Sequence, residues 1–573
     1  MAILQPLIDL AEICYAHGIR NVVISPGSRS AALTLAFVRH RGFKIQVVMD
    51  ERAAGFIALG MAQQTEIPVV LICTSGSAAY NFAPAVSEAF FQQIPLVVFT
   101  ADRPKEWIHQ YDGQTIYQSN IYGKHVRKFF EIPADYEHKD SLWFINRSVN
   151  EAILTASGVP FGPVHVNVPV REPFYPVQSE DMVPSGNVRI VRRVKTSSTL
   201  STDVWHELLN EFDDSPKILV VGAQYKNSTR LCDALAQISE RLDIPVIGDT
   251  ISNQKGNENF ISYHDIFLPV INEQELRPDL LITYGLSLIS KELKQFLRKF
   301  PAVLHWHIGE DPHLGDSYQS LTRKIEVEPE YFFENLFEKI DYQLFVQNSD
   351  PETNPQFLTE WISLDRRAAH LLYKYLLNIT VLNDLTAVNT LLLSLNYKIR
   401  LHVANSMAVR YVNILGKRIS DVVVFSNRGT SGIDGCLSTA IGAALTDPSP
   451  VFLLTGDVAF LYDRNGLLIN ELPNNLKIIV LNNAGGNIFR MIDGPSKLPE
   501  LERYFETSHN FTAQRTAEDA AITYFFAHEL TTFHKQMNLF LECKDTSLIE
   551  VFTDPEENRR VWKGINEYVR QNW

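Results

Sequence analysis

Short runs of β-branched and other apolar residues alternate along this chain with single segments of helical periodicity. This alternation constrains the fold more than any other feature. In the first third, the expected strands span residues 21–25, 45–49, 69–73, 96–100 and 164–168. The helical segments between the first four span residues 31–39, 52–63 and 78–92. Strands joined by single helices pair in parallel, and the helices cover both faces of the sheet. The sequence therefore predicts an α/β protein of the doubly wound class.

The alternation recurs twice more, and one core does not cover a chain of 573 residues. A stretch at 173–202 that is first proline-rich and then polar, and a polar stretch at 347–354, separate the units. We therefore predict domains at residues 1–180, 181–354 and 355–573. Their further strands are expected at residues 217–221, 245–248, 280–284, 303–308, 401–404, 422–426, 451–455, 477–481 and 547–552.

The composition narrows the classes of function. The chain carries a net charge of −14, which does not suit a general binder of nucleic acids or anionic membranes, because both are polyanions. No stretch reaches the roughly 18 apolar residues of a membrane span. The first twenty residues lack the basic start of a signal peptide, and the five cysteines are scattered without a C-x-x-C pair. We therefore expect a cytoplasmic protein that acts on small molecules.

The segment from Thr455 to Gly486 predicts a site for a diphosphate and a metal ion. One expected strand ends in Gly456-Asp457, a helix follows, and a second strand leads into Asn482-Asn483-Ala484-Gly485-Gly486. The two strand ends are neighbours in a parallel sheet, and open α/β sheets bind ligands at that edge. A carboxylate, an amide oxygen and a backbone carbonyl are the hard oxygen ligands that Mg²⁺ prefers. The same residues are common in ordinary turns, and that interpretation stays open.

This spacing resembles the thiamine diphosphate fingerprint, in which Gly-Asp is followed, one helix and one strand later, by Asn-Asn. The resemblance implies that Asp457, Asn483 and the carbonyl of Gly485 ligate the metal, which would be Mg²⁺ or Mn²⁺. Three α/β units in series, with this motif in the last, are also similar to the decarboxylase-like enzymes of that superfamily. Their domains bind the pyrimidine ring, form a middle unit and bind the diphosphate, in this order.

Glu51 is the residue that the resemblance assigns to the other end of the coenzyme. Thiamine diphosphate needs a carboxylate against N1′ of its aminopyrimidine ring, so that the 4′ nitrogen can take the proton from C2 of the thiazolium ring. Glu51 follows the expected strand at 45–49 and begins a helix. A carboxylate at a helix N-terminus is also stabilised by the helix dipole, so a purely structural role stays open.

Longer segments in both terminal domains resemble one family within this superfamily. They are Ser25-Pro26-Gly27-Ser28-Arg29-Ser30, Asp50-Glu51-Arg52, Thr74-Ser75-Gly76-Ser77, Ala101-Asp102-Arg103-Pro104, Asp112-Gly113-Gln114-Thr115, Asn405-Ser406 with Arg410, and Ser426-Asn427-Arg428-Gly429-Thr430-Ser431-Gly432-Ile433-Asp434-Gly435. The family is that of the 2-succinyl-5-enolpyruvyl-6-hydroxy-3-cyclohexene-1-carboxylate synthases of menaquinone biosynthesis. The middle domain adds little to this resemblance.

The resemblance implies a carboligase reaction. Enzymes of this family decarboxylate 2-oxoglutarate and add the succinyl-semialdehyde carbanion to isochorismate in a 1,4-addition. Both substrates are dianions, and arginine offers a planar fork for carboxylates. The substrate-binding residues that the resemblance implies are Ser28, Arg29, Arg103, Gln114, Ser406, Arg410 and Arg428. All of these except Arg103 and Ser406 are also implied as catalytic, together with Glu51. For any single arginine, a surface ion pair or a structural clamp remains the more common role.

The resemblance also implies how the coenzyme is held. Besides Glu51 and the metal ligands, the implied contacts are Ser75, Gly76, Ser406, Ser431, Gly432, Ile433 and Gly456. Ile433 would stand between the two rings of thiamine and impose a V shape, although an ordinary core position is the alternative. The two halves of such sites come from different subunits, which implies a homodimer or a dimer of dimers in which Glu51 of one chain meets Asp457 of another.

Some features depart from the resemblance or compete with it. Val458 stands where many thiamine enzymes have glycine, and Tyr462 where a histidine is frequent. The run His305-Trp306-His307 could be mistaken for a transition-metal cluster, but histidine-rich fragments are more often structural. Two other functions stay open, namely a different thiamine enzyme such as a 2-oxo acid decarboxylase or acetolactate synthase, and a non-catalytic scaffold that binds a diphosphate ligand.

Overall fold

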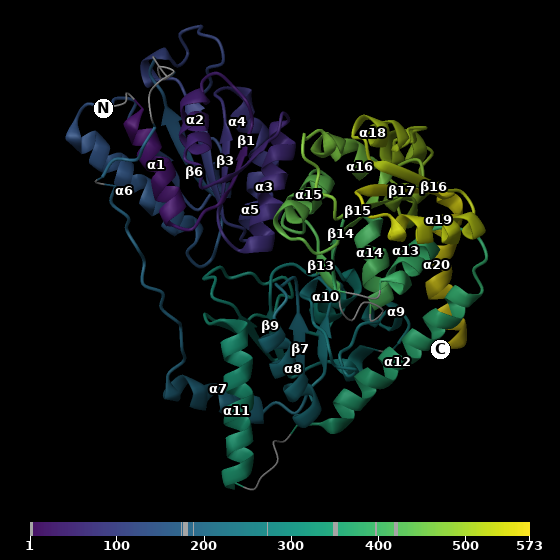
Figure 1. Ribbon diagram of the computed structural model, residues 1–573. Coiled ribbons are helices and arrows are strands. Elements are labelled where there is room, and N and C mark those ends of the chain that lie inside the picture. Colours follow the sequence, from purple (N-terminus) through teal and green to yellow (C-terminus); the bar gives the residue numbers. More distant parts are fainter. Residues whose placement is uncertain are drawn as a thin grey trace.

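The structure is a computed structural model that describes residues 4–172, 175, 182–186, 188–271, 273–347, 353–395, 398–416 and 422–573. Three parallel sheets with helices on their faces form three lobes (Figure 1). The first and third lobes lie side by side, and the middle lobe lies against both. The predicted α/β class is confirmed. The predicted boundary at residue 180 lies outside the described residues, and the one at 354 directly precedes helix α12.

The first sheet has the strand order β2-β1-β3-β4-β6-β5, with all pairs parallel. Its strands are β1 (Asn21–Ile24), β2 (Lys44–Val47), β3 (Val69–Cys73), β4 (Leu96–Asp102), β5 (Phe129–Glu131) and β6 (Val164–Pro169). Its helices are α1 (Gln5–Ala16), α2 (Ala31–Arg39), α3 (Glu51–Thr65), α4 (Ser77–Asn81), α5 (Ala83–Phe91) and α6 (Lys139–Ala156), with 3₁₀ turns η1 (Lys105–Trp107) and η2 (Gly123–His125). The helix predicted at 78–92 is two helices, because Pro84 has no amide hydrogen and fits only the first turn of a helix.

The middle sheet has five parallel strands in the order β11-β10-β9-β7-β8. Its strands are β7 (Ile218–Gly222), β8 (Val246–Gly248), β9 (Leu280–Tyr284), β10 (Leu304–Ile308) and β11 (Arg323–Ile325). Its helices are α7 (Thr202–Asp213), α8 (Thr229–Arg241), α9 (His264–Phe267), α10 (Lys291–Lys299) and α11 (Pro329–Gln347), with turns η3 (Thr250–Ser252) and η4 (Glu273–Leu276).

The third sheet repeats the strand order of the first: β13-β12-β14-β15-β17-β16, again all parallel. Its strands are β12 (Ile399–Val403), β13 (Val422–Phe425), β14 (Val451–Gly456), β15 (Leu476–Asn482), β16 (Thr523–Ala527) and β17 (Ser547–Phe552). Its helices are α12 (Pro355–Leu377), α13 (Asp384–Ser394), α14 (Met407–Leu415), α15 (Cys436–Thr446), α16 (Asp457–Asp463), α17 (Ile488–Met491), α18 (Gln514–Asp519), α19 (Leu530–Glu542) and α20 (Pro555–Asn572). It also has 3₁₀ turns η6 (Arg464–Leu467) and η7 (Pro495–Lys497) and a π-helical segment η8 (Leu501–Glu506). The architectural similarity of the two terminal domains is thus visible in their topology.

Helices α3 and α15 join the first domain to the third through glycines. A Cβ atom added at Gly60 would lie 2.0 Å from the carbonyl oxygen of Thr439, and one at Gly442 would lie 2.1 Å from that of Ile57. A side chain at either position would clash with backbone, so only glycine allows the two helices to approach this closely. The starts of both helices follow strand ends, which brings the loops before them toward one junction.

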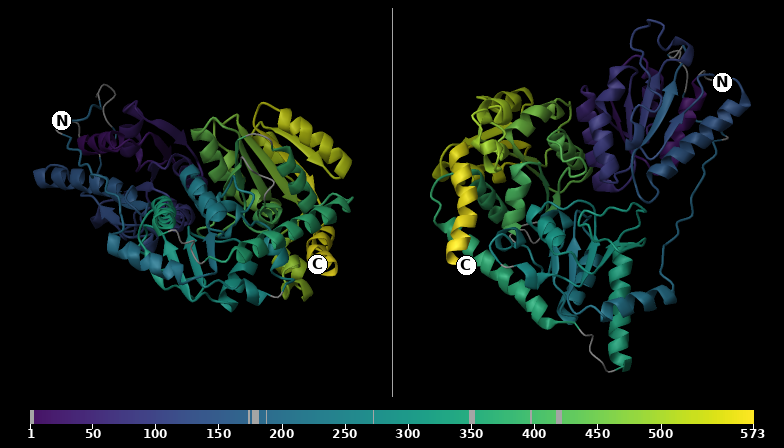
Figure 2. Two further views of the ribbon diagram at one scale, coloured as in Figure 1. Left: turned by 90° about the horizontal axis from the view of Figure 1, so that it is seen from below. Right: turned by 180° about the vertical axis from the view of Figure 1, so that it is seen from behind.

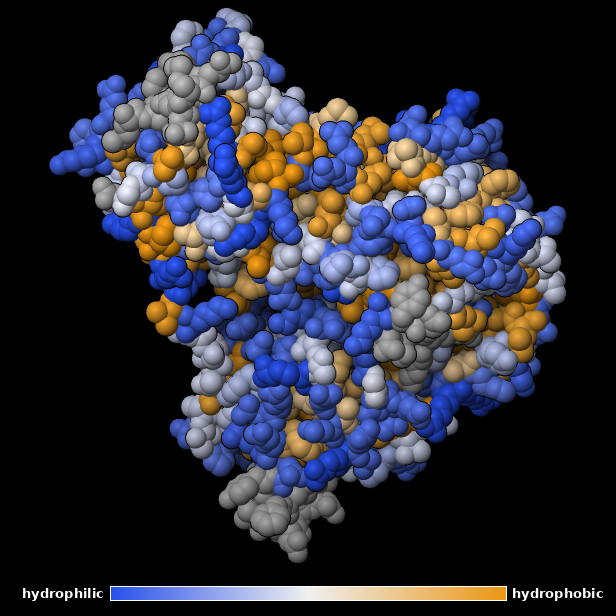
Figure 3. All heavy atoms as spheres, in the orientation of Figure 1, coloured by the Kyte–Doolittle hydropathy of each residue, from blue (hydrophilic) through white to orange (hydrophobic). Residues whose placement is uncertain are grey.

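The connection between the first and middle domains is extended. Residues 191–199 are all exposed and belong to no helix or strand. Figure 1 and the right-hand view of Figure 2 show this segment as a single extended length of chain running from the first lobe to α7. On the face seen in Figure 3, hydrophobic residues gather over the first and third domains, and hydrophilic residues cover most of the middle domain. Within the described residues, no helix is both long and apolar enough to cross a bilayer.

Candidate active site

The predicted site residues lie in loops and helix starts that follow the carboxyl ends of strands. Ser28 and Arg29 follow β1, Glu51 follows β2, Ser75 and Gly76 follow β3, and Arg103 and Gln114 follow β4. In the third domain, Ser406 and Arg410 follow β12, and Arg428 to Ile433 follow β13. Gly456 ends β14, Asp457 begins α16, and Asn483 and Gly485 follow β15. This edge is where parallel sheets bind ligands, so each domain presents its candidate residues on the expected side.

The turn after β15 closes against Asp457. Strands β14 and β15 are direct neighbours, with Gly456 opposite Leu481. The carboxylate of Asp457 is buried and accepts hydrogen bonds from the amides of Val458, at 2.7 Å, and Gly485, at 2.9 Å. A Cβ atom at Gly485 would lie 2.8 Å from the carbonyl oxygen of Glu506, so this turn also has room only for glycine. The structure therefore brings Asp457 and the Gly485 turn together, as the motif predicted.

Asn483 fits the role of a metal ligand. Its Nδ2 donates to Asp384 Oδ2 at 2.9 Å, whereas its Oδ1 is buried and has no hydrogen-bond partner in the described part of the chain. Buried polar atoms without a partner are rare in folded proteins and point to a missing ligand. Asp384 accepts the amide hydrogen, so it fixes the orientation in which Oδ1 remains available. Burial raises the pKa of Asp384 to about 6.

Two more polar residues lie in this region and were not predicted from the sequence. Both side-chain polar atoms of Asn487 are buried and lack partners within the described ranges. Nε2 of His509 lies 3.4 Å from Asp457 Oδ2, and this carboxylate raises the pKa of His509. Neither residue belongs to the Gly-Asp and Asn-Asn motifs. Asn487 directly follows the Gly-rich turn, which is the one signal that could have identified it.

Glu51 is the first residue of α3, and its neighbours contact the third domain. Asp50 caps the helix by accepting from the amides of Arg52 and Ala53, and its other oxygen accepts from Asn465 Nδ2 at 2.7 Å. Glu51 itself accepts a hydrogen bond from Asn81 Nδ2 at 3.2 Å. In this single chain, Glu51 is thus flanked by residues that contact the third domain of the same chain. The prediction that Glu51 meets Asp457 of another chain stays a prediction.

Tyr462, one of the two departures from the resemblance, takes part in this junction. The guanidinium of Arg52 lies 4.3 Å from the centre of the Tyr462 ring and donates to the Tyr462 carbonyl at 2.6 Å. A stacked cation of this kind stabilises the contact by about 0.5–1 kcal/mol when it is exposed. Val458 follows the metal motif, and its amide donates to Asp457.

The four predicted arginines form two pairs. Arg29 is buried, and burial together with the charge of Arg103 lowers its pKa. In the third domain, burial and then the charge of Arg428 lower the pKa of Arg410. Arg103 already lies 2.9 Å from the carboxylate of Asp112, and Arg29 lies 3.4 Å from that of Glu172. Burial also lowers the pKa of Arg428, so Arg410 and Arg428 are two desolvated cations that repel each other, and an anion placed between them relieves that repulsion. This second pair is therefore suited to a carboxylate on physical grounds. The structure describes no direct contact between one pair and the other.

Arg428 carries a donor that the protein itself leaves unused. Its Nη1 donates to Asn405 Oδ1 at 2.9 Å, while its Nε is buried without a partner among the residues that the structure describes. Ser406 and Ser431, which flank the arginine pair, have φ angles of 68° and 61°. Gln114 in the first domain has a φ of 57°. Left-handed backbone is strained for residues other than glycine and clusters at functional sites.

Ile433 is half-buried and packs against the apolar cluster that includes Phe56 of α3. It lies in the loop between β13 and α15, and Gly435 of this loop has a φ of +81° and touches the ring of Phe56. On the first-domain side, Ser75 Oγ is buried without a partner in the described segments, and the amide of Gly76 donates to Gln118 Oε1 at 2.9 Å. The apolar contact is compatible with the predicted wedge and does not test it.

The pH dependence of stability should report on Asp463, a buried carboxyl group at the end of α16. It accepts from the amide and hydroxyl of Ser438, and burial raises its pKa to about 7. Between about pH 4 and 7, the carboxyl group of Asp463 keeps its proton in the folded state and loses it in the unfolded state. The free energy of unfolding of the wild type should therefore fall relative to Asp463→Asn as the pH rises, by about 1.4 kcal/mol per pH unit at most, and level off above pH 7. Urea unfolding of both proteins over this pH range measures the difference in their free energies of unfolding. A difference that does not change with pH would contradict the raised pKa of Asp463.

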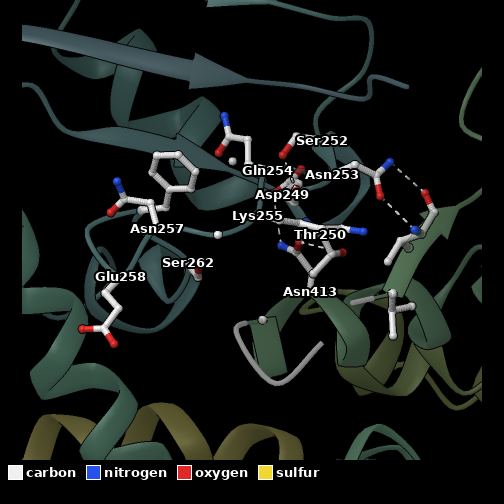
Figure 4. Close-up of a pocket in the computed structure, with 16 residues that line it drawn as sticks. Asp249, Thr250, Ser252, Asn253, Gln254, Lys255, Asn257, Glu258, Ser262 and Asn413 are labelled. Carbon is white, nitrogen blue, oxygen red and sulfur yellow. Dashed lines mark hydrogen bonds between the residues drawn. The ribbon is translucent and has the colours of Figure 1, made fainter. Parts of the chain in front are cut away.

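The middle domain is tied to α14, one turn after Arg410. Asn413 donates to Asp249 Oδ1 at 3.1 Å and accepts from the amide of Thr250 at 3.1 Å, across the hollow that Figure 4 shows. The second oxygen of Asp249 accepts from the amides of Ile289 and Ser290. These bonds fix the middle domain against the helix that carries Arg410.

His305 and His307 have structural partners. Nε2 of His305 and Nδ1 of His307 both lie 2.9 Å from the hydroxyl oxygen of Thr283. Burial lowers the pKa of His305 to about 4 and that of His307 to about 3, so both imidazoles are neutral near pH 7. Strand alternation places both side chains on one face of β10, and the neighbouring strand β9 supplies Thr283 as their shared partner.

Comparison with known proteins connects these loops to one enzyme family. Residues 9–121 match the family described as thiamine pyrophosphate enzyme, N-terminal TPP binding domain, and residues 192–369 match the middle domain of thiamine pyrophosphate enzymes. Proteins of Cytophaga hutchinsonii, Flavobacterium johnsoniae and Porphyromonas gingivalis are 42%, 36% and 34% identical to this chain. The matches cover 100%, 97% and 98% of this chain and 100%, 97% and 96% of theirs. Each relative is named 2-succinyl-5-enolpyruvyl-6-hydroxy-3-cyclohexene-1-carboxylate synthase.

The chain belongs to this synthase family. The family resemblance that the motifs predicted is confirmed, and the similarity extends through the middle domain, which the motifs did not reach. As a member of the synthase family the chain is an enzyme, and its matched domains are those of enzymes that use thiamine diphosphate. The residues present fit that group, since the Asn483 oxygen, the Asn487 amide and the Ser75 hydroxyl are buried polar atoms without partners in the described parts of the chain.

Proposed function

We propose that this chain is a carboligase that decarboxylates 2-oxoglutarate and adds the remaining four-carbon unit to isochorismate. The products would be 2-succinyl-5-enolpyruvyl-6-hydroxy-3-cyclohexene-1-carboxylate and CO₂, within cytoplasmic menaquinone biosynthesis. The observation that supports it most is the unused, buried Nε of Arg428 beside the desolvated Arg410. A protein with a net charge of −14 has a physical reason to keep such a pair if its substrates are dicarboxylates.

When bound, thiamine diphosphate supplies the electron sink for the decarboxylation and the carbon–carbon bond formation. We assign Glu51 to the aminopyrimidine ring, and we propose that Asp457, Asn483 and the Gly485 carbonyl would hold a Mg²⁺ or Mn²⁺ ion, which would neutralise charge on the diphosphate. Ser75, Gly76, Ser406, Ser431, Gly432, Ile433 and Gly456 are assigned to coenzyme contacts. The residues that we assign to the substrates are Ser28, Arg29, Arg103, Gln114, Arg410 and Arg428, together with Ser406, which would contact both coenzyme and substrate.

One assay tests the proposed reaction. The enzyme, with thiamine diphosphate and Mg²⁺, is supplied with 2-oxoglutarate and isochorismate, each is omitted in turn, and the adduct is identified by its mass. We expect the adduct only when both are present. Rapid CO₂ release from 2-oxoglutarate alone would instead favour a simple decarboxylase, and binding of the coenzyme without any turnover would favour a non-catalytic scaffold.

We further propose that the working unit is at least a dimer. Met49 and Tyr80 lie beside Glu51 and Asn81 in the sequence, and they are 69% and 56% exposed in the single chain. Apolar side chains gathered at one place on a surface often mark an interface.

Mixing two inactive variants tests whether the site is shared. If Glu51 of one chain serves Asp457 of another, co-refolded Glu51→Gln and Asp457→Ala chains should regain activity, because some mixed dimers contain one intact site. Either variant refolded alone should stay inactive. If both residues act within one chain, the mixture should remain inactive as well, while gel filtration still reports the dimer.

Arg428→Ala should raise the KM of one of the two substrates about 10-fold to 100-fold. A hydrogen bond to a charged group contributes about 1.5–3 kcal/mol, which corresponds to this range. Arg428→Lys keeps the charge and loses the fork, so it should restore only part of the affinity. Arg560→Ala, at an exposed ion pair on α20, is the matched control and should leave both KM values unchanged. An unchanged KM in Arg428→Ala would remove this arginine from the substrate site.

A further inference from the structure

Glu88 is a fully buried carboxylate that crosses from the first domain to the third. It lies on α5, is 1% exposed, and accepts hydrogen bonds from the amides of Gly429 at 2.7 Å and Thr430 at 2.6 Å. The hydroxyl of Thr430 donates to the same oxygen as its amide, and Gln92 donates to the other at 2.6 Å. A buried charge is costly unless donors satisfy it, and here four donors do so.

These donors belong to the loop that carries the candidate residues of the third domain. Gly429 and Thr430 stand between Arg428 and Ser431, and Ile433 follows. A Cβ atom at Gly429 would lie 2.8 Å from the Glu88 carbonyl oxygen, so the loop lies directly against α5. Because Glu88 binds backbone amides, it holds the loop and leaves the side chains of Arg428 and Ile433 free for other contacts.

The same loop is held from the middle domain. The hydroxyl of Ser287 donates to the Arg428 carbonyl at 3.2 Å, and Gln224 Nε2 donates to the Ser426 carbonyl at 3.2 Å. Gln224 also donates to Gln92 Oε1 at 2.8 Å, so the glutamine that supports Glu88 is bonded to the middle domain. The loop is therefore held by two domains other than its own, and Glu88 is the charged member of this set.

We infer that Glu88 is a positioning residue that sets Arg428 and Ile433 for the substrate and the coenzyme. The inference rests on the proposed function for its substrate part. Glu88 takes no part in the chemistry and contacts neither ligand. Its effect passes through the two amides, which shift when the carboxylate is replaced. A residue that only joined the domains would instead affect stability and nothing else.

Glu88→Gln in the full chain tests this role. The amide keeps the shape of the side chain but turns one acceptor into a donor, which faces an N–H group. We expect an approximately tenfold rise in the KM of the substrate that Arg428 binds, a smaller change in kcat, and coenzyme binding weakened about tenfold by calorimetry. Glu88→Asp keeps the charge and should recover part of both effects. Unchanged KM values and unchanged coenzyme affinity, with only a lower melting temperature, would overturn the inference.

A matched control and a double variant separate positioning from stability. Glu211→Gln removes a charge from the ion pair with Arg323 in the middle domain and should lower the melting temperature without changing KM. Glu88→Gln combined with Arg428→Ala should raise KM no further than Arg428→Ala alone, because both act through one loop. If the double variant raised KM by the product of the two separate effects, Glu88 would act on KM by a route other than the Arg428 loop. The calorimetric result stands even if the proposed reaction fails, since it requires only thiamine diphosphate.

Discussion

Glu51→Gln should lower the turnover number about 10²-fold to 10⁴-fold and leave coenzyme binding largely intact. A positioned group that moves a proton contributes a factor in this range, and glutamine can hydrogen-bond but cannot take up or release a proton. The structure gives Glu51 one hydrogen bond, from Asn81, at the surface of the first domain. Its replacement should therefore cost little stability, so a loss of turnover would report on chemistry.

The measurement needs three readouts on the same preparation: turnover, the affinity for thiamine diphosphate in the presence of Mg²⁺, and the melting temperature. Glu66→Gln is the control, because Glu66 is exposed at the other end of the same helix. It should match the wild type in all three. If Glu51→Gln kept wild-type turnover, the assignment of this carboxylate to the aminopyrimidine ring would be wrong.

Asp457→Ala should abolish metal-dependent binding of the coenzyme. The substitution removes the charged ligand of the proposed metal site and also the acceptor of the Gly485 amide. A ligand at 100 times its dissociation constant stabilises the folded state by about 2.7 kcal/mol, and this gain should disappear. Thermal unfolding with and without thiamine diphosphate and Mg²⁺ measures it directly, since the wild type should melt at a higher temperature with both present.

Asn483→Ala should show a weaker form of the same result, because a neutral amide oxygen is lost. The control is Asp519→Asn, which removes an exposed carboxylate of the same domain. It should keep the full rise in melting temperature. If Asp457→Ala showed the same rise in melting temperature as the wild type, the metal and the diphosphate would have to bind elsewhere in the chain.

The interior strands could be predicted from the sequence, and three of the six edge strands of the described sheets could not. Interior strands such as β3 and β14 are buried along almost their whole length, because helices cover both faces of a parallel sheet. Three strands were missed: β5, β11 and β16. Each lies at the edge of its sheet. Strands β5 and β11 have only three residues each, too few to form a recognisable apolar run. Strand β16 is partly exposed, and its run Tyr524-Phe525-Phe526-Ala527 is the signal that could have identified it.

The residues of the candidate site also divide into those that could be predicted from the sequence and those that could not. Asp457, Asn483 and Glu51 could be identified because each follows a strand end within a short, recognisable segment. Glu88 and Asp384 could not, because their partners are 341 and 99 residues away in the sequence. No local sequence pattern indicates which distant group a buried carboxylate on a helix will contact. The packing of the first domain on the third places Glu88 on the Arg428 loop, and the packing of α13 within the third domain places Asp384 on Asn483.

The glycine contacts between α3 and α15 fix the distance between the first and third domains of the chain. Side chains in an interface can change rotamer and absorb small movements, but two main chains in contact have no such freedom. The spacing of the first-domain and third-domain loops within one chain is therefore set by contact between main-chain atoms. Each chain of the proposed dimer would then present both of its half-sites to its partner at a fixed spacing, so little coenzyme binding energy would be spent on moving domains.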